Sequence, residues 1–394
     1  MKLVFISCYM SPHQKPFCDE MYKMLEGDFV FIATQPIEEE RLSMGWNSDR
    51  ADYIIYAYRD KTEEQKAHEA VNDADVVIIG SAPDSYILPR LKTKKLTFKY
   101  AERFYKTGLT LRNLPHAAAG AWLHHGRFQR YPLYMLCASA YTPADAAIFH
   151  NYVGRTYKWG YFPEVKRYDV AELMEKKQSA ASVGEEHSRI SILWAGRLIG
   201  WKHPEAAVQL AASLKEKGYS FRMSMIGNGE MEIQLHDMIR EKGLEDCVEM
   251  LGAMPPEEVR RHMEKADIYL FTSDFNEGWG AVLNESMNSG CAVVANREAG
   301  AVPYLIEHGK NGMIYSGGSY EEFLGAVCFL MEHGEERRKM GENACQTIVS
   351  LWNAQNAAEQ CLRFYDNWLQ GKVEPPPEGP FSTAPVVWPG RRRG

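Results

Sequence analysis

The segment 268–296 constrains the fold of this chain more than any other, because it places a glycine turn between two apolar runs. A short, largely apolar run of the kind that forms a buried strand comes first. Gly278 and Gly280 then permit a tight turn with close backbone approach. A helix-forming stretch follows and ends at Gly290, before a second apolar run. The segment therefore predicts a strand–helix–strand unit.

The glycine turn predicts an anion-binding site. Free N–H groups at a helix N-terminus and the helix dipole both point toward a ligand there. Glu277 lies in the turn, and Glu285 lies about one turn inside the helix. A nucleotide sugar carries phosphate between two sets of hydroxyls, and each glutamate could accept hydrogen bonds from one diol. A solvated pair with no such role is an equal alternative, since glutamate is a common residue.

Length and charge bound the class of protein. The 394 residues suit two domains. The net charge of −7 argues against a general nucleic-acid-binding protein, which normally has a basic surface. No apolar run is long enough to span a bilayer, and residues 1–10 are better interpreted as a first strand than as a signal peptide. The eight cysteines include no CxxC pair, which favours reduced thiols and a cytoplasmic protein.

Strands and helices alternate in both halves, which predicts an α/β protein with parallel sheets covered by helices on both faces. Ligands bind such sheets outside the carboxyl ends of the strands. We expect an N-terminal Rossmann-like domain over residues 1–175, a polar linker over 176–188 and a C-terminal Rossmann-like domain over 189–350. The proline-rich tail, 372–394, is expected to be disordered.

Two cations follow the strand expected at 190–195. Arg197 and Lys202 are expected at the same sheet edge as Glu277. Arg can grip a phosphate with two parallel hydrogen bonds, and Lys offers a point charge. Lys202 alone is better explained as a solvated residue at the start of a helix. Two cations, a glycine-rich helix start and two framing carboxylates are together hard to assign to packing.

These motifs resemble the retaining glycosyltransferases with the GT-B fold, of the family 4 type. Glu277 and Glu285 match the E-x7-E element of that family, and Gly196-Arg197-Leu198-x3-Lys202 matches its diphosphate site. The resemblance covers roughly residues 188–350, and the combination of motifs is specific. The remaining matches are Ile226-Gly227-Asn228-Gly229, Gly290-Cys291-Ala292-Val293-Val294-Ala295 and Gly309-Lys310-Asn311-Gly312.

The resemblance implies a GT-B architecture, in which two facing, doubly wound Rossmann-like domains have a cleft between them. Residues 351–371 would form a helix that crosses back to the N-terminal, acceptor-side domain. Where family members often have a Gly-Gly pair after the first strand, this chain has Ser11-Pro12-His13-Gln14. Because His13 follows the first strand, it is our candidate for a catalytic residue at the cleft. A loop histidine with only a turn role is equally consistent.

The resemblance also implies roles in the C-terminal domain. Arg197 and Lys202 would neutralise the diphosphate leaving group, and Glu277 would bind hydroxyls of the donor sugar. Glu285 would bind the ribose diol. Front-face attack would retain the anomeric configuration, and no metal or cofactor is expected. The other substrate-binding candidates are Gly227, Asn228, Gly278, Trp279, Gly280 and Ala281.

Three other motifs carry weaker signals. Asp73-Ala74-Asp75 is a D-x-D, the metal motif of a different glycosyltransferase fold, but it precedes a buried strand and is better interpreted as helix-end charge. His124-His125 lacks metal-ligand spacing to a cysteine or carboxylate. Glu102 and Arg103 fit a structural salt bridge slightly better than an acceptor-binding pair. A Ser–His–Asp hydrolase is not supported, because the sequence contains no G-x-S-x-G.

We therefore expect an enzyme that moves a sugar from a nucleotide-diphosphate sugar to an acceptor hydroxyl, in cell-surface polysaccharide or glycolipid synthesis. A sugar-nucleotide epimerase of the same architecture and a non-catalytic nucleotide-sugar-binding protein remain alternatives. The expected partners are the donor and a saccharide or lipid-linked acceptor, without nucleic acid.

The expected location is the cytoplasm, or a peripheral position at the inner membrane face. The basic end of the tail, 391–393, could touch an anionic membrane, although a solvated end is the simpler interpretation. The sequence does not identify the nucleotide base or the sugar of the donor, and it does not identify the acceptor or the oligomeric state.

Overall fold

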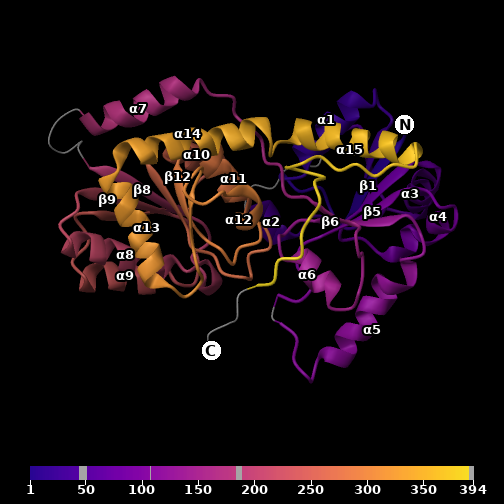
Figure 1. Cartoon of the computed structure of the whole chain (residues 1–394), viewed down its shortest axis with the longest axis horizontal. Helices are drawn as coiled ribbons and strands as arrows, with labels where there is room; N and C mark the ends of the chain where they lie inside the picture. The colour runs from indigo at the N-terminus through magenta and orange to yellow at the C-terminus, as the bar shows by residue number, and fades with distance from the viewer. Residues whose placement is uncertain (44–50, 107, 183–188, 390–394) are drawn as a thin grey trace. The chain divides into compact units, whose positions relative to one another are not determined.

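The chain forms two compact units, each with its own parallel sheet (Figure 1). Unit 1 joins residues 1–164 to residues 352–389, and unit 2 comprises residues 165–351. The computed structural model describes residues 1–43, 51–106, 108–182 and 189–389.

Unit 1 is built on a seven-stranded sheet in the order β3-β2-β1-β4-β5-β6-β7, in which every neighbouring pair is parallel. Its strands are β1 (Leu3–Ser7), β2 (Phe29–Ala33), β3 (Ile54–Tyr56), β4 (Val76–Ile79), β5 (Thr97–Ala101), β6 (Leu133–Cys137) and β7 (Thr156–Lys158). Its α-helices are α1 (Lys15–Met24), α2 (Glu39–Ser43), α3 (Lys61–Asp73), α4 (Leu88–Lys92), α5 (Leu114–His124), α6 (Thr142–Ala147) and α15 (Ala354–Leu369). Short 3-10 helices follow β4 (η1, Asp84–Tyr86) and α5 (η2, Gly126–Phe128).

Unit 2 is built on a six-stranded parallel sheet in the order β10-β9-β8-β11-β12-β13. Its strands are β8 (Ile190–Ala195), β9 (Phe221–Ile226), β10 (Val248–Gly252), β11 (Ile268–Phe271), β12 (Ala292–Asn296) and β13 (Met313–Tyr315). Its helices are α7 (Val170–Ser182), the 3-10 helix η4 (Gly200–Lys202), α8 (Pro204–Glu216), α9 (Glu232–Glu241), α10 (Pro256–Lys265), α11 (Ala281–Asn288), α12 (Val302–Leu305), α13 (Tyr320–Glu332) and α14 (Gly334–Ser350).

The central strands are buried on both faces. Every residue of β1, β4, β11 and β12 is buried, and their sequences are nearly continuous apolar runs. Such runs form parallel strands that need helices on both faces, because a sheet with one wet face would show alternating polar residues. The α/β class expected from the sequence is confirmed.

Strand order fixes the ligand edge of unit 2. β8 pairs with β9 on one side and with β11 on the other, so the chain leaves the central strand in opposite directions. The carboxyl edge beside β8 and β11 is therefore the point where the strand order reverses, and ligands of open α/β sheets bind at such a point. In unit 1 the same arrangement places β1 between β2 and β4.

The boundary between the units differs from the expected one. Unit 2 begins at Val165, ahead of the boundary expected at 175, and the first residues of the expected linker, 176–182, are the end of α7. Lys177 explains why this polar stretch is ordered: its buried ammonium donates to the carbonyl oxygens of Met263 (3.0 Å) and Ala266. The rest of the expected linker, 183–188, lies outside the described residues.

The tail was expected to be disordered, and over residues 372–389 this expectation is wrong. The side chain of Phe381 is fully buried, and its ring centroid lies 5.3 Å from that of Trp159 and 5.4 Å from that of Phe98. The backbone N–H of Phe381 donates to the Lys158 carbonyl of β7 (2.8 Å). One aromatic anchor and edge-strand hydrogen bonds therefore outweigh the entropy of a proline-rich backbone. The last expected tail residues, 390–394, lie outside the described part.

The buried ring of Phe381 predicts that the tail stabilises unit 1. Phe381→Ala should lower the free energy of unfolding by about 3–5 kcal/mol, because it removes a buried aromatic ring and leaves a cavity. The matched control is Trp388→Ala, whose side chain is 60% exposed and whose loss should change stability by less than about 0.5 kcal/mol. Urea unfolding of both variants measures the difference. Equal effects would contradict an anchoring role for Phe381.

Candidate functional site

The loops after β8 and β11 are tied together by hydrogen bonds at the carboxyl edge of unit 2. The buried indole of Trp194 on β8 donates to Thr272 Oγ1 (2.8 Å), and that hydroxyl donates to the carbonyl of Lys202 (2.6 Å). The backbone N–H of Asp274 donates to the carbonyl of Trp201 (3.0 Å). Side chains on these two loops are therefore held in a fixed mutual position.

The central interaction of this site is an ion pair between Lys202 Nζ and Glu277 Oε2. The two side chains are only 14% and 12% exposed, so water screens their attraction weakly. The backbone of Glu277 is fixed on both sides, since its N–H donates to the Asp274 carbonyl (3.0 Å) and its own carbonyl accepts from Gly300 (3.1 Å). The structure thus brings together a cation and a carboxylate that the sequence placed on separate loops.

A second cation lies on the same loop. The guanidinium carbon of Arg197 lies 5.7 Å from the ring centroid of Trp201, and Lys202 Nζ lies 4.8 Å from it. Trp201 therefore contacts both cations through its ring, an arrangement that cation–π attraction favours. Arg197 is exposed, whereas Lys202 is largely covered. The loop therefore presents positive charge at the switch point of the sheet, which is the carboxyl edge beside β8 where the strand order reverses.

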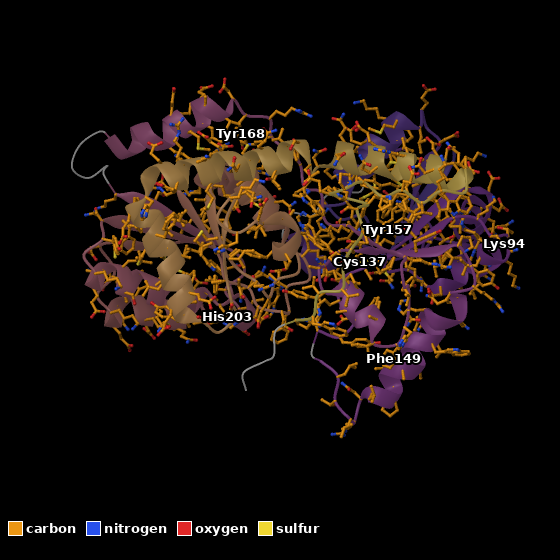
Figure 2. All side chains as sticks on the ribbon, viewed as in Figure 1. Lys94, Cys137, Phe149, Tyr157, Tyr168 and His203 are labelled. Atoms are coloured by element: carbon orange, nitrogen blue, oxygen red, sulfur yellow. The ribbon has the colours of Figure 1, made fainter. Side chains whose placement is uncertain are left out.

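His203 adds a third positive charge (labelled in Figure 2). Its Nε2 lies 3.4 Å from Asp274 Oδ2 and its Nδ1 lies 2.8 Å from Glu205 Oε1. Hydrogen bonds to Asp274 and Glu205 raise the pKa of His203 from 6.5 to about 10, since both carboxylates stabilise the imidazolium. The charged ring therefore links the start of α8 to the loop that carries Glu277.

The glycine turn before α11 has the geometry expected of an anion site. Gly280 is the N-cap residue, with φ of +93°, and a Cβ at this position would collide with the Phe271 ring. The described side chains provide no cap for the first turn of α11. Trp279 is fully buried, and its indole donates to Asn284 Oδ1 (2.8 Å), so its side chain anchors the turn. The groups that this turn can offer a ligand are mainly backbone N–H groups, from Gly278, Trp279, Gly280 and Ala281.

Glu285 projects from α11 beside a buried arginine. Its Oε1 lies 4.0 Å from Arg260 Nη2, and its side chain is 27% exposed. Arg260 on α10 also donates to the Glu285 carbonyl (3.2 Å) and to Asn288 Oδ1 (3.0 Å). Burial raises the pKa of Glu285 above its ordinary value, and the charge of Arg260 opposes that rise. A ligand that donates hydrogen bonds would stabilise the carboxylate.

Gly227 and Asn228 support the cationic loop through their backbone. A Cβ on Gly227, whose φ is +140°, would overlap the carbonyl oxygen of Gly196. The carbonyl of Asn228 accepts from the N–H of Leu198 (2.8 Å), and the Asn228 side chain is exposed. The loop after β9 therefore packs directly against the loop that carries Arg197.

In unit 1, His13 lies in the loop between β1 and α1. Its ring stacks on Tyr161 with centroids 5.8 Å apart, and its carbonyl accepts from the N–H of Phe162 (3.0 Å). Burial lowers the pKa of His13 to about 4, so the imidazole is neutral at pH 7. A neutral imidazole can accept a hydrogen bond from a hydroxyl at one ring nitrogen and donate one from the other.

Glu102 and Arg103 were interpreted as a pair, but each has another partner. Arg103 forms a buried ion pair with Asp145 (3.0 Å), whose carboxylate also accepts from the N–H of Phe104 (2.9 Å). Glu102 binds Lys106 (2.7 Å) and accepts from the hydroxyl of Tyr161 (2.6 Å). β5 ends at Ala101, directly before these two residues, and each side chain then pairs with a different part of unit 1.

Asp73 and Asp75 lie at the amino ends of the strands, opposite the ligand edge. Asp73 ends α3 and pairs with Lys2 Nζ (2.6 Å), while Asp75 accepts from the N–H of Lys2 (2.9 Å). This placement agrees with the interpretation as helix-end charge. The adjacent histidines also have separate partners: His124 contacts Asp84 and His125 contacts the Tyr152 hydroxyl, both at 2.9 Å. Within the described ranges, no three His, Cys, Asp or Glu residues are grouped to hold a metal.

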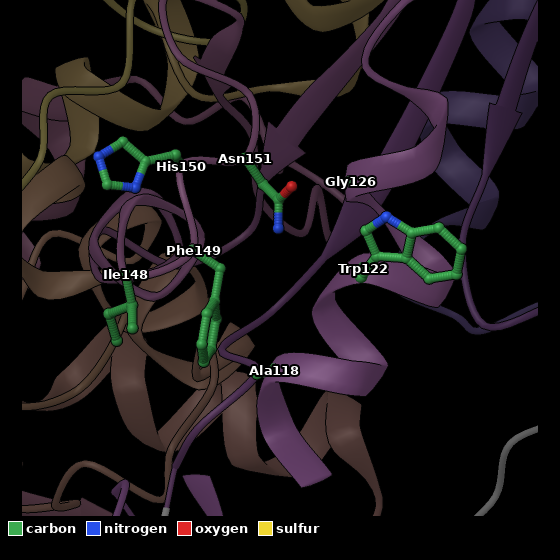
Figure 3. A pocket seen from close by; sticks show the side chains of 7 residues that line it. All are labelled: Ala118, Trp122, Gly126, Ile148, Phe149, His150 and Asn151. Atoms are coloured by element: carbon green, nitrogen blue, oxygen red, sulfur yellow. The ribbon is translucent and has the colours of Figure 1, made fainter. Parts of the chain in front are cut away.

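Two open pockets lie among the described residues of unit 1. One of about 450 Å³ lies at the carboxyl ends of β2, β3 and β4, and its lining includes Gln35, Tyr58, Asp60, Ser85 and Tyr86. The other, of about 360 Å³, lies beside α5, between Trp122 and the segment 148–151 (Figure 3). The first pocket occupies the edge of the sheet where ligands of such folds bind.

Sequence reasoning missed Trp201, His203, Asp274 and Arg260. His203 directly follows a predicted site residue and Asp274 lies near Glu277 in sequence, so proximity along the chain could have indicated both. Arg260 gave no such signal, because it lies on α10 and reaches Glu285 only through the packing of α10 on α11. The residues that support the charged groups depend on tertiary contacts.

The family described as glycosyl transferases group 1 has a sequence model that matches residues 175–347. The chain is 34% identical, over 154 residues, to the amylovoran biosynthesis glycosyltransferase AmsK of Erwinia amylovora; the match covers 38% of this chain and 37% of that protein. It is 30% identical, over 194 residues, to the putative colanic acid biosynthesis glycosyltransferase WcaL of Salmonella typhimurium, covering 45% of this chain and 47% of that one. The chain thus spans less than half the length of these relatives.

Similarity to solved structures extends over nearly the whole chain. The crystal structure of Anabaena Alr3699/HepE in complex with UDP superimposes with a TM-score of 0.67 and 15% identity, covering 92% of this chain and 99% of that one. At this identity the similarity shows the fold, and the fold is GT-B, as the sequence motifs implied.

The raised pKa of His203 predicts a pH-dependent contribution to stability. A pKa raised by folding stabilises the native state fully below the unfolded value of 6.5, and the contribution is lost as pH rises toward about 10. The difference in unfolding free energy between wild type and His203→Gln should therefore be largest below pH 6.5 and shrink by pH 10. Urea unfolding at several pH values measures it, with exposed His236→Gln as control. A difference that is constant across this range would contradict the charged state of His203.

Proposed function

We propose that this chain, whose residues 175–347 match the model of glycosyl transferases group 1, transfers a sugar from a nucleoside-diphosphate sugar to an acceptor hydroxyl. The observation that carries the proposal is the Lys202–Glu277 pair at the switch point of unit 2, with Arg197 on the same loop. Cations, a carboxylate and an uncapped helix start suit a ligand that combines phosphate with sugar hydroxyls.

The donor is assigned to unit 2. Arg197 and Lys202 bind the diphosphate together with the backbone N–H groups at Gly280 and Ala281, while Glu277 accepts hydrogen bonds from the donor sugar. Glu285 accepts from the ribose, which compensates for the burial that raises its pKa. The similarity of this fold to HepE, which was crystallised with UDP, supports a nucleotide-diphosphate donor.

The proposed chemistry needs charge stabilisation more than a nucleophile. The bond between the anomeric carbon and the diphosphate oxygen breaks, and the acceptor oxygen bonds to that carbon on the same face. The acceptor proton passes to the departing diphosphate, whose charge Arg197 and Lys202 stabilise. Because these two cations supply the charge, we propose that transfer needs no divalent metal. Because the acceptor attacks on the face that the diphosphate leaves, we propose that the anomeric configuration is retained.

The acceptor is assigned to unit 1. Its pocket of about 450 Å³ combines the aromatic side chains Tyr58 and Tyr86 with polar groups from Gln35 and Ser85, a lining that suits a saccharide. The names of the relatives AmsK and WcaL refer to amylovoran and colanic acid biosynthesis, which supports a growing polysaccharide or its lipid-linked precursor as acceptor. The eight free cysteines support a cytoplasmic location.

The two glutamates should affect different kinetic steps. Glu277→Ala should lower turnover about a hundredfold, because its contact with the reacting sugar strengthens in the transition state. Glu285→Ala should instead weaken donor binding about tenfold, since a ribose contact is equal in ground and transition states. Calorimetric donor affinity and transfer rate are measured on the same preparations, with exposed Glu241→Ala as control.

Reaction conditions also separate the alternatives. Transfer should persist in excess EDTA, and complete loss that magnesium restores would contradict the metal-free proposal. An epimerase would convert the donor without acceptor, and a binding protein would leave it intact. Small, equal effects of Glu277→Ala and Glu285→Ala with the fold preserved would contradict the assignment of their roles.

His13 provides the test of the division between the units. His13→Ala should leave affinity for the nucleoside diphosphate within about twofold, because each donor-binding group assigned above belongs to unit 2. Transfer should fall at least about tenfold, since the neutral imidazole is proposed to act on the acceptor. Exposed His236→Ala is the control. If His13→Ala weakens nucleotide binding tenfold, about 1.4 kcal/mol, the division is wrong.

A further inference from the structure

Helix α5 of unit 1 exposes apolar side chains that an ordinary surface helix would bury. Leu111, in the turn before α5, is 92% exposed, and Trp122 is 61% exposed. Leu123 and Leu114 on the same helix are 42% and 38% exposed. Single exposed hydrophobics are common on proteins, whereas four of them along one helix and the turn before it mark an interaction surface. These four residues, with Arg112, Arg127 and Arg130, are called the α5 surface below.

The composition of α5 makes the exposure more informative. The helix reads Leu-Pro-His-Ala-Ala-Ala-Gly-Ala-Trp-Leu-His, and Ala121 is its one buried residue among those described. Helices that are apolar all round normally lie inside a protein or a membrane. In Figure 1, α5 lies at the lower edge of unit 1, away from the strands of the sheet. Unit 1 therefore leaves most of this apolar helix without protein cover.

Charge around α5 has one sign. From Arg103 to Pro163 the sequence contains a single carboxylate, Asp145, although the chain as a whole holds 52 Asp and Glu residues. Asp145 is 3% exposed and neutralised by Arg103. The same segment carries seven Lys and Arg residues: Arg103, Lys106, Arg112, Arg127, Arg130, Arg155 and Lys158.

Three of these cations are exposed at the two ends of α5. Arg112 precedes the helix, and Arg127 and Arg130 follow it. Arg127 and Arg130 each lie over a neighbouring ring, at 4.5 Å from Phe128 and 4.9 Å from Tyr131. The part of the chain that the structure describes places no carboxylate within ion-pair distance of these three. Nearby Asp84 is already paired with Lys99 and His124.

We propose that the α5 surface docks on the face of a bilayer that contains anionic lipids. Exposed leucines and a tryptophan enter the boundary between headgroups and acyl chains, where the indole N–H stays near water, and the flanking arginines bind the headgroup phosphates. No described helix is long and apolar enough to cross a bilayer, so contact lies along the surface. The inference concerns docking alone and stands independently of the proposed transfer.

Charge also favours a bilayer over a second copy of this chain. A two-fold symmetric dimer through the α5 surface would bring the arginines of one copy close to those of the other. An anionic membrane instead offers a phosphate to each arginine. Its attraction acts within a Debye length, and over this short distance the net charge of −7, which is spread over the chain, does not cancel it. The basic tail residues considered from the sequence are not needed for this contact.

Flotation of the full-length protein with vesicles tests the docking. Wild type should float with vesicles of equal phosphatidylglycerol and phosphatidylcholine, should not float with phosphatidylcholine alone, and should be released by 0.5 M salt, about three times physiological ionic strength. Leu111→Ser with Trp122→Ser should weaken partitioning at least about tenfold. Arg112→Gln with Arg127→Gln and Arg130→Gln should weaken it about a hundredfold.

Matched controls make the outcome decisive. Ile233→Ser removes a side chain that is 78% exposed on α9, and Arg222→Gln with Arg240→Gln and Arg261→Gln changes net charge equally in unit 2. Both controls should float like wild type, and thermal unfolding confirms that all variants are folded. Three outcomes would overturn the proposal: absence of binding to anionic vesicles, equal losses in the controls and the test variants, or competition by free glycerol 3-phosphate. So would light-scattering masses that show a dimer broken by the Leu111 and Trp122 substitutions.

Discussion

The site of unit 2 depends on the ion pair between Lys202 and Glu277. Two opposite charges that are nearly covered attract strongly, but each has lost much of its hydration. In the proposed function, a ligand exchanges with this pair by offering a phosphate to Lys202 and hydroxyls to Glu277. One interaction thus joins the two loops and sets the polarity that the proposed donor would match.

The geometry of the ion pair depends on the backbone that carries its two partners. Gly280 allows the turn that carries Glu277, and Gly227 lets the loop after β9 lie directly on the loop that leads to Lys202. His203 then holds Asp274, whose carbonyl accepts from Glu277, so a charged hydrogen bond reinforces the same loop. Local conformation, tertiary hydrogen bonds and charge therefore all contribute to the position of this pair.

The sequence predicted the features that recur along the chain but not those that depend on contacts between distant segments. Apolar runs such as β11 and β12 and the glycines at 278 and 280 specify local structure, so the α/β class and the turn before α11 were predictable. Arg260, the buried ring of Phe381 and the helical end of the expected linker were not, because composition cannot show which side chain fills a distant space. Glu102 and Arg103 illustrate the same limit, since their partners come from the segment after β7, from α6 and from their own loop.

Positive charge is distributed in two different ways in this acidic chain. At the carboxyl edge of unit 2, Lys202 and His203 are each matched by carboxylates, so the charge is local and directed at a small ligand. Around α5 the arginines lie beside exposed apolar residues in a segment almost free of carboxylates, so the charge extends over a surface. A compensated cation favours a ligand that can displace its partner, whereas an uncompensated cation beside apolar groups favours an extended anionic phase. The physical difference between the two regions assigns them different partners.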